Sequence, residues 1–136
     1  MISTGFPMSI NSRQKGKRTE LELAHKLEEI MGWTARRTAQ FCGANGDSDV
    51  TVESIPQLFV ESKCVEKLNV VAAMKQAASD AKAAGKLPCL CHRRNRTEWL
   101  VTIRLTDLPL FAQMVEQSRC MRAEQNAATS GTADMI

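Results

Sequence analysis

The rest of this chain is organised around the stretch Leu58-Phe59-Val60-Glu61-Ser62-Lys63, which ends an apolar run with a carboxylate and an ammonium two residues apart. On a strand, alternation places Phe59, Glu61 and Lys63 on one face and the other three side chains on the opposite face. A carboxylate beside a lysine can hold a divalent cation while the ammonium faces an anionic group, as in a site that hydrolyses phosphodiesters. An isolated acid-x-lysine pair is also common as an exposed ion pair of little consequence. The rest of the chain has to decide between these interpretations.

Length and composition are those of one ordinary globular domain, with 136 residues of which 43% are apolar and 24% are charged. Such a chain can bury a core without metal or disulfide bonds. No apolar run approaches the length of a membrane span, and residues 1–11 lack the basic-then-apolar pattern of a signal peptide. The five cysteines are odd in number and fit no disulfide framework, which is typical of a reducing compartment. We expect an intracellular, cytoplasmic protein without membrane association.

Hydrophobic periodicity and turn residues divide the chain into helices and strands. The predicted elements are a helix over 16–31, strands over 33–38, 48–52 and 58–63, a helix over 69–84, strands over 88–92 and 98–103, and a last helix from Thr106. Asn69 and Gly85 are typical of a helix start and a helix end. The strand-helix-strand connection from 58 to 92 is expected to be right-handed and to make part of the sheet parallel. The sequence therefore predicts an α/β fold with a mixed sheet.

The two ends of the chain lack the hydrophobic periodicity that the middle of the chain has. Residues 1–12 carry no periodic pattern and are predicted to be a flexible arm. Residues 13–124 are predicted to form a single domain that includes the last helix. Residues 125–136 are small and polar enough to predict a disordered tail.

Four residues from this pattern could act together on a phosphodiester. Asp49 and Glu61 lie on strands joined by a short turn, so both carboxylates could reach the same end of the sheet. Hydrolysis by metal-bound water requires hard oxygen ligands with open coordination positions and a cation near the phosphate. Lys63 supplies that cation, and Glu20 from the first helix could complete the ligand set.

Three segments of the chain resemble the PD-(D/E)xK nucleases, and within them the archaeal-type Holliday junction resolvases and their phage relatives. Lys15-Gly16-Lys17-Arg18-Thr19-Glu20-Leu21-Glu22-Leu23 is similar to the opening signature of that group, a basic residue and glycine before a helix whose first acid binds metal. Residues 46–50 resemble the segment that supplies the aspartate, and 60–63 resemble the acid-x-lysine half of the motif. The resemblance covers about 13–103 and implies a restriction-endonuclease-like αβββαβ core with a central mixed sheet flanked by helices.

The resemblance leaves some positions open. It assigns the helix acid to Glu20, with Glu22 as the competitor. Ser48 stands where the motif has proline, so Asp47 is a rival to Asp49. Gln76 lies where many relatives carry a glutamine near the active site, but it could equally be an exposed helix residue. The catalytic set implied by the resemblance is Glu20, Asp49, Glu61, Lys63 and Gln76, of which Glu20, Asp49 and Glu61 are the metal ligands.

The resemblance implies a Mg²⁺-dependent endodeoxyribonuclease, with Mn²⁺ as a substitute, in a bacterial or phage context. Its expected substrate is a four-way DNA junction, recognised by shape and resolved by paired symmetric nicks. Symmetric nicking of two strands requires a twofold homodimer. The alternatives are a repair or restriction nuclease acting on duplex, flap or single-stranded DNA, and a non-catalytic DNA-binding module of the same fold.

Basic residues cluster in three places where they could contact phosphates without reading the sequence. The predicted DNA-binding residues are Arg13, Lys15, Lys17, Arg18, Arg36, Arg37, Arg93, Arg94 and Arg96. Cys89, Cys91 and His92 invite a zinc interpretation, but alternation turns the cysteines to one face and the histidine to the other, and no second ligand pair follows. Buried cysteines are expected instead. Phe111 and Met114 could form either a dimer interface or core.

Overall fold

One mixed sheet organises the first 103 residues, and its five strands lie in the order β1-β2-β3-β4-β5. The computed structural model describes the backbone of residues 5–38 and 48–134, and the side chains of residues 13–38 and 48–128. The elements of the first unit are α1 (Gly5–Met31), β1 (Ala35–Arg37), β2 (Val50–Val52), β3 (Leu58–Cys64), α2 (Val70–Ala84), β4 (Leu87–Arg93) and β5 (Leu100–Thr102). This order confirms the predicted αβββαβ core and its mixed sheet.

Strand pairing places β3 at the centre of the sheet. β3 pairs antiparallel with β2 and parallel with β4, with Leu58 opposite Leu87 and Cys64 opposite Arg93. The outer pairs, β1 with β2 and β4 with β5, are antiparallel. The parallel pair is joined through α2, because parallel neighbours require a crossover connection. The crossover predicted from the sequence is therefore confirmed.

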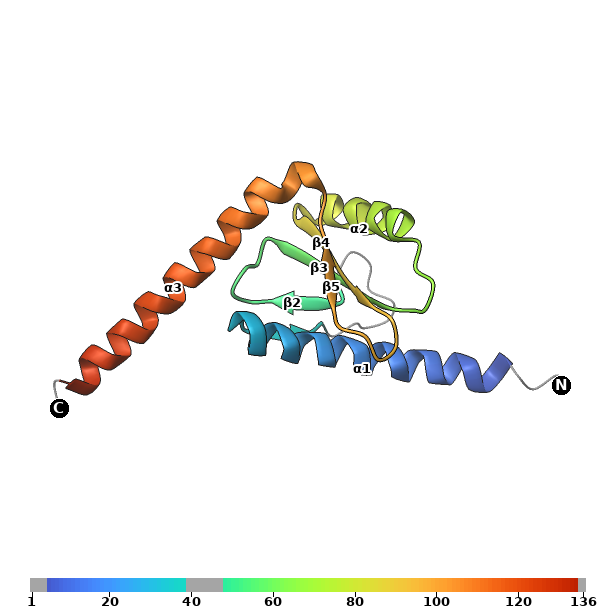
Figure 1. Ribbon diagram of the computed structural model, residues 1–136, viewed down its shortest axis with the longest axis horizontal. Coiled ribbons are helices and arrows are strands. Elements are labelled where there is room, and N and C mark those ends of the chain that lie inside the picture. Colours follow the sequence, from blue (N-terminus) through green and yellow to red (C-terminus); the bar gives the residue numbers. More distant parts are fainter. Residues whose placement is uncertain (1–4, 39–47, 135–136) are drawn as a thin grey trace. The chain divides into compact units, whose positions relative to one another are not determined.

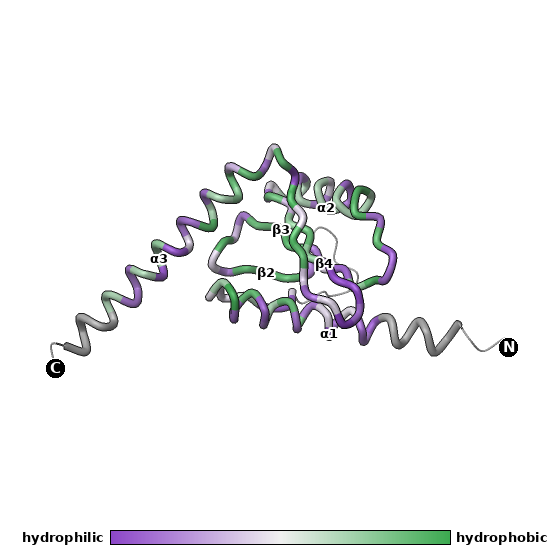
Figure 2. Tube along the Cα trace, viewed as in Figure 1, coloured by the Kyte–Doolittle hydropathy of each residue, from purple (hydrophilic) through white to green (hydrophobic). Residues whose placement is uncertain are grey.

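The first half of β3 is buried on both faces. Leu58, Phe59 and Val60 are at most 2% exposed, and β4 is buried from Leu87 to Cys91. Continuous burial of this kind is typical of parallel strands that helices cover on both faces. Figure 1 shows α1 and α2 on opposite sides of the sheet, and Figure 2 shows hydrophobic segments concentrated on the central strands. The polar residues of β3 therefore begin only at Glu61, after the buried first half of the strand.

Helix α2 begins and ends as its sequence predicts. The Asn69 side chain accepts a hydrogen bond from the Ala72 backbone N–H at 3.0 Å, which satisfies one N–H of the first turn. Gly85 has φ +68°, a left-handed conformation that glycine adopts without a Cβ penalty, and its N–H bonds carbonyls of the last turn. Buried Met74, Ala77 and Ala81 form the inner face. These caps fix the length of the connection between β3 and β4.

Both chain ends are more helical than the sequence analysis predicts. α1 begins at Gly5, so the structure has a helix over most of the range 1–12, for which the sequence predicts a flexible arm. Pro7 is tolerated there because N–H groups of a first turn have no intrahelical acceptor. The last helix, α3 (Leu108–Asp134), likewise continues through most of the predicted disordered tail over 125–136. Its side chains at 122–128 are all exposed, and a polar composition suits an exposed helix as well as a disordered segment.

The chain divides after Ile103 into two compact units. The second unit contains a short 3-10 helix, η2 (Leu105–Asp107), followed by α3. From the sequence, the last helix is instead predicted to lie in one domain with the sheet, over 13–124. Asp47, the rival to Asp49, lies outside the described residues. In the part of the chain that the structure describes, no helix is both long enough and apolar enough to span a membrane.

Candidate active site

Asp49 and the polar end of β3 lie side by side. Asp49 directly precedes β2, and its backbone N–H donates to the Val60 carbonyl oxygen at 3.1 Å. Its carboxylate accepts a hydrogen bond from the Ser62 backbone N–H, with a distance of 2.9 Å from N to Oδ2. The antiparallel register of β2 and β3 thus places Asp49 beside Glu61 and Lys63, as predicted from the hairpin pattern.

The Glu61 carboxyl is electrostatically unusual. Its pKa is raised from the ordinary 4.5 to about 8, chiefly because burial disfavours the charged form and then because the Asp49 charge repels a second negative charge. Lys63 lowers the pKa, while a hydrogen bond with Asp49 and the charge of Asp80 raise it further. Two carboxyl groups in this arrangement share either a proton or a cation. The pair has the electrostatics of a cation site.

Two acids of α1 have different partners. Glu20 Oε2 accepts a hydrogen bond from Arg37 Nε at 2.7 Å, and the Glu20 side chain is 14% exposed. Burial and the charge of Asp49 raise the Glu20 pKa, while Arg37 and Lys17 lower it. Asp49 is therefore an electrostatic neighbour that Glu20 shares with Glu61.

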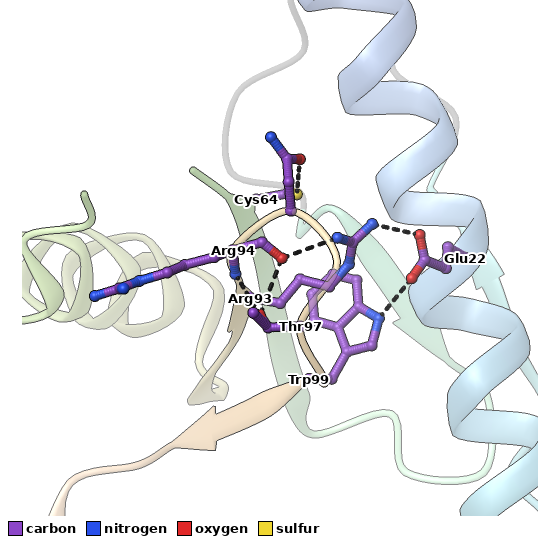
Figure 3. Close-up of polar contacts among 7 residues, drawn as sticks. Glu22, Cys64, Arg93, Arg94, Thr97 and Trp99 are labelled. Carbon is purple, nitrogen blue, oxygen red and sulfur yellow. Dashed lines mark hydrogen bonds and ion pairs between the residues drawn. The ribbon is translucent and has the colours of Figure 1, made fainter. Parts of the chain in front are cut away.

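Glu22 accepts hydrogen bonds from two residues near β4 and β5. One of its carboxylate oxygens accepts from Arg93 Nη2 at 2.7 Å and the other from Trp99 Nε1 at 3.1 Å (Figure 3). The Arg93 guanidinium also lies over the Trp99 ring, 5.3 Å from its centroid. These contacts join α1 to the segment around β4 and β5. Of the two helix acids left open by the sequence, Glu20 is the one whose pKa the Asp49 charge raises.

Comparison with known proteins assigns the chain to a nuclease family. The family model described as "Phage putative PDDEXK endonuclease" matches residues 11–133. The chain belongs to this PDDEXK family. The structure of Hjc, a Holliday junction resolvase from the hyperthermophile Archaeoglobus fulgidus, is similar over 65% of this chain and 72% of that chain, with 22% sequence identity and a TM-score of 0.49. A search of curated proteins gave no match.

The donor set of this PDDEXK chain fits a divalent cation in part. Asp49 and Glu61 supply hard oxygen donors, and burial together with the Asp49 charge keeps the Glu61 pKa raised although the Lys63 charge lowers it. Among the described residues, however, no three His, Cys, Asp or Glu side chains are grouped so that they could hold a metal ion. Glu20 is held by Arg37 instead. A third protein ligand would therefore require Glu20 to leave Arg37.

The raised Glu61 pKa predicts how stability depends on pH. Between the unfolded pKa of 4.5 and the folded value of about 8, the folded protein holds an extra proton, so stability falls as pH rises through this window. In EDTA, Glu61→Gln should be more stable than the wild type at pH 8, by on the order of 2 kcal/mol after discounting for solvent screening. At pH 4.5 the two proteins should differ little. Chemical unfolding at both pH values measures this, and equal differences at both would contradict it.

Gln76 contacts Asp80, a residue near Glu61 that sequence reasoning missed. Its side chain is exposed on α2, and its Nε2 donates to both carboxylate oxygens of Asp80, at 3.1 and 3.2 Å. Asp80 is one of the charges that raise the Glu61 pKa, so it lies near the site. The i,i+4 spacing of Gln76 and Asp80 on the helix was the available signal.

The nine basic residues predicted to bind DNA have different surroundings. Arg36 pairs with Glu53, Arg37 with Glu20, and Arg93 with Glu22. Arg93 is only 15% exposed, so it is held within the fold and not presented on the surface of the turn. Lys15 is half-buried, and the exposed ones are Arg13, Lys17, Arg18, Arg36, Arg94 and Arg96.

The cysteine segment of β4 belongs to the core. Cys89 and Cys91 are 3% and 1% exposed, and their sulfur atoms lie 4.0 Å apart. His92 Nε2 instead contacts the Thr102 hydroxyl at 2.8 Å, on the neighbouring strand β5. The expectation of buried cysteines is confirmed.

Proposed function

We propose that this chain is a metal-dependent endodeoxyribonuclease that resolves four-way DNA junctions by paired symmetric nicks. The observation that carries the proposal is the Asp49 and Glu61 carboxyl pair beside Lys63, in which the Glu61 pKa is raised to about 8. A partly buried pair of acids next to an exposed ammonium, on a central strand, suits hydrolysis of an anionic ester. Membership of the PDDEXK family supports nuclease chemistry.

Each residue of the site has its own proposed role. Asp49 and Glu61 would hold Mg²⁺ or Mn²⁺, with Glu20 as the further ligand. The cation, when bound, polarises the phosphate and makes a water molecule easier to deprotonate. The Lys63 side chain is exposed near the end of β3, where the substrate can reach it. Its positive charge would neutralise negative charge that develops on the phosphate. Gln76, whose amide donates to Asp80, would hydrogen bond the attacking water or the substrate.

The junction as substrate is the finer part of the proposal. It rests on the similarity of residues 15–23 to the opening signature of the resolvases, and on family membership for DNA as the polymer. Symmetric nicking needs two copies of the site related by a twofold axis. The edge strand β5 carries exposed Leu100 and Val101, which suits a self-complementary contact between two copies.

A cleavage assay on matched substrates tests this function. With Mg²⁺, a four-way junction should be nicked at symmetric positions on two strands, whereas a linear duplex of the same arm sequences should stay intact. EDTA should abolish nicking, and Mn²⁺ should restore it. Equal cutting of the linear duplex would instead favour a repair or restriction nuclease. Absence of any cutting with either metal would leave only a DNA-binding module.

A further inference from the structure

A cavity of about 400 Å³ lies between α1 and the turn that follows β4. Its walls include Lys15, Arg18 and Glu22 from α1, Cys64 from the end of β3, and Arg93 and Asn95 from β4 and its turn. Figure 3 shows Glu22, Cys64 and Arg93 converging at this place from three different elements. The volume is ample for a phosphate group with part of the sugar attached to it.

The cavity carries an excess of positive charge. Three of its wall residues are cationic and one is anionic, and the anion Glu22 is already paired with Arg93 at 2.7 Å. Neither Lys15 nor Arg18 forms an ion pair among the described residues. Two cations therefore face the cavity without a compensating carboxylate. An anion is the ligand that this charge distribution favours.

Arg93 is held in one orientation by its neighbours. Nη2 donates to Glu22, Nη1 donates to the Arg94 carbonyl oxygen at 3.1 Å, and the guanidinium lies over Trp99. Its Nε is buried and has no hydrogen-bond partner. Buried polar groups are normally satisfied, so this N–H is a donor that the protein itself leaves unused. A small shift of the side chain toward an anion in the cavity would satisfy it.

Asn95 and Cys64 form the opposite part of the wall. Asn95 Nδ2 donates to Glu66 at 3.2 Å, and its Oδ1 accepts from Cys64 Sγ at 3.6 Å, so the amide is oriented from both sides. Cys64 directly follows Lys63 on β3, and alternation turns the two side chains to opposite faces. The cavity therefore lies one residue from the proposed catalytic lysine, on the α1 side of the strand.

We propose that this cavity binds a non-scissile phosphate of the DNA strand that is cut at Lys63, and thereby sets the position of the nick. The proposal rests on the proposed function, because it needs a strand that passes the end of β3. Phosphates recur every 3.4 Å of helix axis along a strand, so a strand held at the scissile group brings neighbouring phosphates to this region. Lys15 and Arg18 are the residues that contact the phosphate, and the Glu22, Arg93 and Trp99 contacts keep the wall in place.

The test removes the two uncompensated charges together. The variant Lys15→Gln/Arg18→Gln is compared with Lys26→Gln/Lys86→Gln, which loses the same charge from exposed positions outside the cavity. Fluorescence anisotropy measures junction affinity in EDTA between 50 and 300 mM NaCl. The cavity variant should bind at least about tenfold more weakly at low salt, and its log-log salt slope should decrease by about 1, the value for one lost phosphate contact. The control should keep most of its affinity. Equal behaviour of the two variants would overturn the proposal.

Nick mapping tests the second part of the proposal. With Mg²⁺, the cavity variant should spread its nicks over neighbouring phosphodiesters, whereas the control should keep the wild-type positions. Unchanged positions in the cavity variant would overturn the role in setting the nick. Thermal unfolding of both variants checks that the fold is intact, and single Lys15→Gln replaces the double variant if it is not.

Two further readings separate the sources of failure. Binding is measured in EDTA, so it does not depend on cleavage. If the wild type cuts no DNA but the two variants show the expected salt slopes, the nuclease function is overturned and the phosphate site is retained. Inorganic phosphate and a mononucleotide are titrated in parallel. Saturable binding of either that is lost in the cavity variant, with junction affinity unchanged, would assign the cavity to a small phosphate ligand and overturn its role in holding DNA.

Discussion

Replacing Asp49 with asparagine should lower the rate of metal-dependent nicking by about 1,000-fold, which corresponds to about 4 kcal/mol of transition-state stabilisation. Asparagine keeps the oxygen that accepts the Ser62 N–H bond and removes only the charge. Asp49 is the carboxylate that both Glu20 and Glu61 have as an electrostatic neighbour, so its charge is central to any cation site here. Single-turnover nicking of a labelled junction measures the effect.

The control for this variant is Glu29→Gln, because Glu29 is an exposed carboxylate of α1 with a 68% exposed side chain. It should nick at the wild-type rate. The free energy of unfolding of Asp49→Asn in EDTA should not fall, since losing the Asp49 charge also relieves the repulsion that raises the Glu61 pKa. Wild-type nicking by Asp49→Asn would remove Asp49 from the site and with it the proposed metal ligands.

The central part of the fold was predictable from local patterns. The alternation over 58–63 and the turn before it fix the hairpin that brings Asp49 to Glu61. Asn69 and Gly85 determine the ends of α2 through their own backbone and side-chain bonding. These signals lie within a few residues of the structure that they specify, so one sequence is enough to read them.

The partners of charged side chains were not predictable in the same way. Arg93 and Glu22 are 71 residues apart in the chain, and Arg37 and Glu20 are 17 apart. Composition places all four on a surface, because charged residues are usually exposed. Only the packing of α1 against the sheet shows which arginines are engaged by glutamates. The pairing of Arg93 with Glu22, which holds Arg93 within the fold, could not be predicted from the sequence for this reason.

The helical ends of the chain were not predicted for a different reason. Residues 5–15 and 118–134 lack a regular apolar stripe, and sequence reasoning depends mainly on that stripe. A helix that buries little has no such pattern, so its polar sequence resembles that of a disordered segment. The relation of Asp80 to Glu61 was not predictable for the reason given for the charged pairs, because it depends on how α2 packs on the sheet.

Glu20→Gln and Glu22→Gln should separate catalysis from stability on the same helix. Glu20→Gln should lower the nicking rate by about 100-fold, or about 3 kcal/mol, because Glu20 is the helix carboxylate near Asp49. It should change the free energy of unfolding by less than about 1 kcal/mol. Burial and Asp49 raise the pKa of Glu20 despite its bond to Arg37, so the site does not favour its charged form. A neutral amide therefore costs the fold little.

Glu22→Gln should show the opposite pattern. The carboxylate accepts bonds from the Arg93 guanidinium and the Trp99 indole, and Arg93 is only 15% exposed. Losing the charge leaves Arg93 poorly compensated and should lower the free energy of unfolding by about 1–2 kcal/mol, since the Glu22 side chain is 41% exposed and partly screened. Nicking of saturating junction at a temperature where the variant is folded should stay within about threefold of wild type. If Glu22→Gln instead loses nicking and Glu20→Gln keeps it, the helix ligand is Glu22, and Arg93 must release that carboxylate when the cation binds.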